Sequence, residues 1–170
     1  SKEDKEYFIY MSKQAKKAEV YYLHEEIGFN YRMSNLLAAL GIAQLADFDF
    51  RLKRKKAINL FYRSCLEELG FRFLSAREDA TPSYWLSCAL VPDHVDAGTL
   101  ISQLDGNYNI ESRFIWNPMH RQPVFQNEEA LLNGASEQLF KKGICLPSGV
   151  GLSDDQLKYV VDAIKRIISH

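Results

Sequence analysis

The side chains best suited to bind an anion lie within residues 24–35 of the 170-residue chain. Gly28 lets a backbone approach a ligand closely because it carries no side chain. Asn30 offers an amide with two donor hydrogens, and Arg32 offers a guanidinium that suits phosphate or carboxylate. Both residues precede a predicted helix N-terminus, which itself attracts anions. The alternative is that Asn30 and Arg32 only cap this helix.

A second cationic feature is the run RLKRKK at residues 51–56, which holds five cations in six positions. Such a run can bind the phosphates of a nucleic acid. The alternative is the solvated face of a long helix, which we favour because the run has no base-stacking partners. The formal net charge of the whole chain is -1. We therefore expect no nucleic-acid partner.

Composition indicates a soluble globular protein, with 46% hydrophobic and 25% charged residues. The three cysteines, Cys65, Cys88 and Cys145, lie far apart in the sequence and show no metal-ligand spacing. An odd number of cysteines without a secretory segment indicates reduced thiols. No apolar run approaches the roughly 18 residues of a membrane span. We expect a cytoplasmic location, no metal site and no membrane partner.

Apolar residues at helical spacing position these features on helices. The predicted helices cover residues 4–18, from Ser34 onward, 47–69, 95–104 and 153–168. Ser34, Asp96 and Ser153 are the expected N-terminal caps, and Gly70 ends the long third helix.

Alternating patterns between these helices predict short strands at residues 71–75, 84–91, 109–115 and 143–146. Strands and helices therefore mix, and the fold class is α+β. We expect a small antiparallel sheet covered on one face by helices. Residues 1–45 are expected to form a helical appendage.

Four segments of the chain resemble one enzyme family, in that family's order. The run EIGFNYRMSNLLAALG at residues 26–41 resembles the helix entry of the DegT-type (DegT/DnrJ/StrS) nucleotide-sugar aminotransferases, which depend on pyridoxal phosphate (PLP). The resemblance returns at SYWLSC (residues 83–88), ESRFIWNPMH (residues 111–120) and GICLPSG (residues 143–149).

This resemblance implies the C-terminal part of a PLP-dependent transferase of the aspartate-aminotransferase fold (fold type I). Residues 1–45 would be a helical remnant of the large PLP-binding domain, and residues 46–170 the small C-terminal domain. The family works as a homodimer with a shared active site. The resemblance implies that Asn30 contacts the PLP phosphate held by the partner subunit and that Arg32 lies nearby.

The segment at residues 111–120 resembles the part of the family that holds the nucleotide-sugar. Arg113 would pair with diphosphate oxygens, Trp116 would pack on the sugar or base, and His120 would hydrogen-bond a substrate oxygen. The alternatives are that Arg113 pairs with a nearby acid, Glu111 or Asp105, and that Trp116 belongs to the core. For His24, a structural role is the alternative to one in the site.

The resemblance implies transfer of an amino group from an amino acid, glutamate by expectation, to a nucleotide-linked keto-sugar. A UDP-linked 4-keto sugar is the more specific expectation. The family's Schiff-base lysine follows a segment that these 170 residues do not contain, so we expect the chain alone to be inactive. The alternative is a non-catalytic binding or interaction module derived from the same small domain.

Overall fold

The computed structural model describes residues 1–18 and 21–169. It divides into two compact units, residues 1–48 and 49–170, so the boundary lies three residues after the predicted one. Each unit is described by itself. None of the helices in the described part of the chain has the length and apolar character needed to cross a bilayer.

The first unit begins with α1 (Lys2–Ser12), which is shorter than predicted. Gln14 and Ala15 have positive φ angles of 65° and 51°, so the backbone turns instead of continuing the helix. The returning segment then pairs with the end of α1. The backbone amides of Phe29 and Tyr31 donate hydrogen bonds to the carbonyl oxygens of Met11 and Ser12.

Gly28 is required by this pairing. A Cβ atom at position 28 would overlap the backbone of Gln14 and Ala15 and would lie 2.9 Å from the Cβ atom of Ala15. Ala15 is completely buried. The close approach expected at Gly28 is therefore to the protein's own chain.

The second helix of this unit is α2 (Asn35–Ala46), and it begins where the sequence predicts. The Ser34 side chain accepts a hydrogen bond from the amide of Leu37 and so caps the helix. The large apolar side chains of α2 are exposed: Leu36, Leu37, Leu40, Ile42 and Leu45.

The second unit contains the small antiparallel sheet that the sequence predicts. Its strands are β1 (Arg72–Phe73), β2 (Ser87–Leu90), β3 (Arg113–Phe114) and β4 (Gly143–Leu146). They lie in the order β1-β2-β4-β3, and every neighbouring pair is antiparallel.

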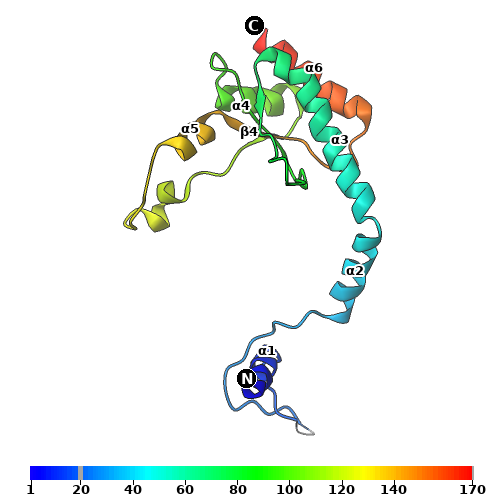
Figure 1. Cartoon of the computed structure of the whole chain (residues 1–170), viewed down its shortest axis with the longest axis vertical. Coiled ribbons are helices and arrows are strands. Elements are labelled where there is room, and N and C mark those ends of the chain that lie inside the picture. The colour runs from blue at the N-terminus through cyan, green and yellow to red at the C-terminus, as the bar shows by residue number, and fades with distance from the viewer. Residues whose placement is uncertain (19–20, 170) are drawn as a thin grey trace. The chain divides into compact units, whose positions relative to one another are not determined.

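Three helices pack on one face of this sheet and form the core with it (Figure 1). They are α3 (Phe48–Leu66), which continues into the short 3-10 helix η1 (Glu67–Leu69), α4 (Ala97–Tyr108) and α6 (Asp154–Ile168). Asp96 caps α4, Ser153 caps α6, and Gly70 ends η1 in the left-handed conformation, as predicted. The core contains buried residues from the sheet and from each of the three helices, among them Ile58, Tyr62, Leu66, Ala89, Leu100, Leu104, Ile144, Leu146, Leu157, Val160 and Ile164.

Three strands, β1, β2 and β3, are shorter than predicted, and local backbone geometry explains the last two. Tyr84 has a positive φ of 49°, so the residues before Ser87 leave the ladder. Asn109 takes the left-handed conformation at the end of α4, and the amide of Ile110 donates to the carbonyl of Leu104. These two residues close the helix instead of starting β3.

Residues between β3 and β4 form an arm that leaves the sheet and returns through α5 (Ala135–Lys142), drawn in yellow and orange in Figure 1. The arm contains two 3-10 helices, η2 (Met119–Arg121) and η3 (Pro123–Phe125). None of these three helices was predicted from the sequence.

Candidate functional site

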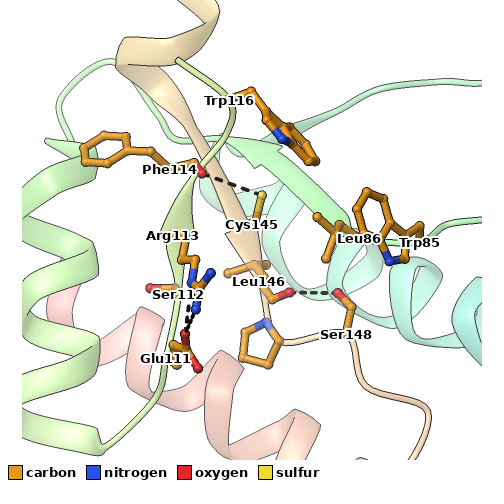
Figure 2. Close-up of a pocket in the computed structure, with 11 residues that line it drawn as sticks. Trp85, Leu86, Glu111, Ser112, Arg113, Phe114, Trp116, Cys145, Leu146 and Ser148 are labelled. Carbon is orange, nitrogen blue, oxygen red and sulfur yellow. Dashed lines mark hydrogen bonds and ion pairs between the residues drawn. The ribbon is translucent and has the colours of Figure 1, made fainter. Parts of the chain in front are cut away.

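A pocket of about 480 Å³ opens beside β3 and β4 (Figure 2). It is lined by segments that are far apart in the sequence: residues 85–86, residues 111–114, Trp116 and residues 145–148. In Figure 2, the two tryptophans lie on one side of Cys145, and Arg113 with Glu111 lies on the other. The pocket therefore combines an aromatic wall with a charged one.

The aromatic wall is a pair formed by Trp85 and Trp116. Their ring centroids are 6.0 Å apart, and the rings are tilted by 37°. Both side chains are about two-thirds exposed, at 67% and 65%. Trp116 is therefore not a core residue, and its ring is available to an aromatic or sugar ligand.

The charged wall is Arg113, whose Nε atom donates to the Glu111 carboxylate at 2.9 Å. Of the two acids considered for Arg113, Glu111 is the partner that the structure shows. Both side chains are exposed. An exposed ion pair of this kind contributes little free energy, so an entering phosphate can replace Glu111 at low cost.

His120 lies on η2 in the arm and is not part of this pocket. Its Nε2 atom is 2.7 Å from a carboxylate oxygen of Glu137, and both side chains are largely buried. A hydrogen bond from its own backbone amide lowers the pKa of Glu137, and the neighbouring Ser136 and His120 lower it further. The carboxylate is therefore the close ion-pair partner of the imidazole. The structure brings Arg113 and Trp116 together but places His120 elsewhere.

Asn30 and Arg32 belong to the first unit, and both side chains are exposed. Among the described residues, neither side chain has a hydrogen-bond or ion-pair partner. The backbone around them is held, because Tyr31 donates to the Ser12 carbonyl at 3.1 Å. An exposed amide and an exposed guanidinium are groups that can bind a phosphate. Both side chains are therefore available to an anion, and a role at the PLP phosphate stays a prediction.

His24 has a structural role in the same unit. Its Nδ1 atom lies 2.8 Å from the carbonyl oxygen of Gln14, within the turn that follows α1. The alternative of a structural histidine is therefore the one that the structure supports.

The sequence profile of the DegT/DnrJ/EryC1/StrS aminotransferase family matches residues 1–165. The chain belongs to this family. It is 35% identical, over a 162-residue alignment that covers 91% of this chain, to EpsN of Bacillus subtilis, which is named as a pyridoxal phosphate-dependent aminotransferase. It is 36% identical over 147 residues, or 85% of its length, to GDP-perosamine synthase of Vibrio cholerae.

The chain spans about two fifths of the length of these curated relatives of the DegT/DnrJ/EryC1/StrS family, 41% of EpsN and 40% of the synthase. Among solved structures, the aminotransferase TlmJ from Streptoalloteichus hindustanus superposes with a TM-score of 0.83 at 18% identity. The superposition covers 99% of this chain and 46% of TlmJ. This likeness shows that the chain has the fold of the family's C-terminal part.

One residue that holds the backbone of this pocket, Lys55, was not predicted from the sequence. Lys55, part of the cationic run on α3, donates to the carbonyl oxygens of Trp85 at 2.8 Å and of Ser148 at 2.6 Å. Burial lowers the pKa of this lysine. The signal in the sequence was the apolar stripe of the long helix, because Lys55 lies one turn before the buried Ile58 and Asn59.

Among the described residues, no group of three or more histidine, cysteine or acidic side chains is placed to hold a metal ion.

Proposed function

We propose that the chain is the C-terminal part of a PLP-dependent aminotransferase that moves an amino group from an amino acid to a nucleotide-linked keto-sugar. The observation that carries this proposal is the family match over residues 1–165. The name of EpsN supports the cofactor, and the name of GDP-perosamine synthase supports a nucleotide-sugar. The whole enzyme would work as a homodimer with a shared active site and would lie in the cytoplasm.

Asn30 and Arg32 are the residues of this chain that would hold the cofactor. Their side chains would bind the phosphate of the PLP in the partner subunit, by charge-assisted hydrogen bonds. When bound, PLP supplies the electron sink that amino-group transfer requires. The backbone pairing of residues 29–31 with the end of α1 supports this proposal, because it holds the main chain at Asn30.

Arg113 and Trp116 would bind the nucleotide part of the substrate in the pocket beside β3. The guanidinium would exchange Glu111 for the diphosphate, and the indole would cover the base or the sugar. His120 would hydrogen-bond a substrate oxygen, with Glu137 holding the ring in one orientation. Because His120 lies in the arm, its contact requires a ligand that extends beyond the pocket.

The nucleotide is either UDP or GDP in this proposal. We expect a UDP-linked 4-keto sugar from the sequence motifs, whereas the name of the Vibrio cholerae relative favours a GDP-linked one. The described residues of the pocket accommodate both, because an indole face stacks on a pyrimidine or a purine.

The test uses the full-length protein with PLP, glutamate and either UDP- or GDP-linked 4-keto sugar. Mass spectrometry should find an amino sugar together with the keto acid derived from glutamate. If an amino sugar forms from only one of the two nucleotide-linked sugars, that sugar is the substrate. If no amino sugar forms from either the UDP-linked or the GDP-linked keto-sugar, the proposal is contradicted.

The 170-residue chain itself contains no lysine in the setting that the family uses for covalent cofactor binding. Incubation with PLP and reduction with borohydride should leave no stoichiometric lysine adduct, as measured by intact-protein mass spectrometry. A single stoichiometric adduct would contradict this expectation. The alternative function, a binding module without catalysis, predicts instead that the full-length protein binds nucleotide-sugar but forms no adduct either.

A further inference from the structure

Lys55 joins two segments that form the pocket. Its ammonium group lies 2.8 Å from the carbonyl oxygen of Trp85 and 2.6 Å from that of Ser148. Trp85 and Ser148 both line the pocket, whereas Lys55 lies behind them on α3. One side chain therefore fixes the backbone of the segment before β2 and of the segment after β4.

The Ser148 side of this junction is rigid without Lys55. Ser148 is buried, and its hydroxyl accepts a hydrogen bond from the Ser87 amide at 2.9 Å and donates to the Leu146 carbonyl at 2.7 Å. The Tyr62 hydroxyl also donates to the carbonyl of Pro147 at 2.9 Å. Lys55 therefore has one firmly held acceptor.

The Trp85 side depends more strongly on Lys55. Tyr84, the preceding residue, has a positive φ of 49°, a conformation that a bulky residue keeps only when its surroundings impose it. Trp85 itself is 67% exposed, so little packing holds its ring. The bond from Lys55 to the Trp85 carbonyl is a polar contact that ties this backbone to the core helix.

We propose that Lys55 is a positioning residue that holds Trp85 opposite Trp116 and thereby sets the width of the aromatic wall for a nucleotide. The ligand in this inference rests on the proposed function. An ammonium group is suited to the task because it has three donors and needs two of them for the carbonyls. Without Lys55, the segment at Trp85 loses its anchor and the two rings separate.

The first experiment uses the 170-residue chain, whose two tryptophans are Trp85 and Trp116. In a Trp116→Phe background, Trp85 is the sole tryptophan, and its quenching by acrylamide measures its exposure. Lys55→Met should increase the quenching constant by up to about 1.5-fold, because a lost anchor lets the segment move and Trp85 is already two-thirds exposed. Lys55→Arg, which also donates to two carbonyls, should restore the original constant.

Two controls separate positioning from general loosening. Lys56→Met removes an exposed neighbouring cation and should leave the quenching of Trp85 unchanged. In the reverse background, Trp85→Phe, Lys55→Met should raise the quenching of Trp116 less than it raises that of Trp85, because Trp116 loses only its ring neighbour. Equal increases for both tryptophans, or no increase for Trp85, would overturn the proposal. Lys55→Gln replaces Lys55→Met if circular dichroism shows that the methionine variant does not fold.

The second experiment titrates the chain carrying both tryptophans with UDP and, separately, with GDP. Lys55→Met should raise Kd about five- to tenfold for the nucleotide that binds, and Lys55→Arg should restore it. An unchanged Kd would overturn the positioning role. If the unmodified chain binds neither nucleotide, the proposed substrate pocket fails, while the quenching of Trp85 still decides whether Lys55 positions it.

Discussion

The Sγ atoms of Cys88 and Cys145 lie 3.6 Å apart, at directly opposed positions of β2 and β4. Both cysteines are free thiols in the structure. Burial, and then the neighbouring Cys145, raises the pKa of Cys88 from 9.0 to about 12. Cys88 therefore stays protonated at neutral pH and is a poor nucleophile, because the thiolate is the reactive form.

We accordingly expect Cys88 to resist alkylation in the folded chain. With iodoacetamide at pH 8, the Cys88 peptide should be modified about tenfold more slowly, or slower still, than in urea. Peptide mapping by mass spectrometry measures both rates on the same residue, so the denatured chain is the control. Equal rates in the two conditions would show that Cys88 is not shielded.

Gly28→Ala should open the first unit. The added Cβ would overlap the backbone of Gln14 and Ala15, and we expect a cost of about 1–3 kcal/mol or more. Hydrogen exchange of the Phe29 and Tyr31 amides should accelerate, because these amides hold the returning segment against α1.

The matched control for that variant is Gly41→Ala in α2. A Cβ at position 41 has no neighbour within 4 Å in the described structure, and alanine favours a helix by about 1 kcal/mol over glycine. This variant should leave the exchange of Phe29 and Tyr31 unchanged. If both variants accelerate exchange alike, the close approach at Gly28 does not stabilise the unit.

Tyr62→Phe should destabilise the second unit by about 1–2 kcal/mol, because the Pro147 carbonyl loses its hydroxyl donor at a buried position. The free energy of unfolding in urea measures the effect. Tyr159→Phe is the control. Its hydroxyl donates to the Tyr108 carbonyl at 3.2 Å from a half-exposed side chain, so its loss should cost within about 0.5 kcal/mol. Equal costs would mean that burial adds nothing at Tyr62.

Asn30→Ala in the full-length protein should weaken PLP retention about tenfold or more, since a hydrogen bond to a charged phosphate is lost. Thermal stability of the apoprotein should not change, because the side chain is exposed. Asn127→Ala, another exposed asparagine, should leave both quantities unchanged. Unaltered PLP affinity in the Asn30 variant would remove this residue from the phosphate site.

Helix ends were predictable from sequence where one side chain decides them. Ser34, Asp96 and Ser153 cap helices through their own oxygen atoms, and Gly70 supplies the left-handed end of η1. These signals depend on only a few neighbouring residues.

Elements decided by distant contacts were not predictable in the same way. The first helix stops at Ser12 because residues 13–17 pair with residues 23–31, a contact that no local pattern reveals. The short α5 was missed because its eight residues give few helical turns and its N-cap residue, Gly134, has no side chain to cap the helix.

The same distinction holds for the candidate site. Arg113 and Trp116 were identified through a motif that resembles a family, and the structure places them in one pocket. Lys55 was read as part of a solvated cationic face, although its ammonium lies against two carbonyl oxygens. Every residue has a backbone carbonyl oxygen, so no sequence pattern predicts which carbonyl a lysine will bind.

The anchoring of the pocket by α3 uses acceptors that belong to the main chain. Lys55 and Tyr62 bind the carbonyls of Trp85, Pro147 and Ser148 rather than their side chains. Substitutions that replace these side chains leave the acceptors in place. The side chains that line the pocket can therefore diverge in evolution to select different ligands. The hydrogen bonds from α3 to the backbone of these segments would stay the same.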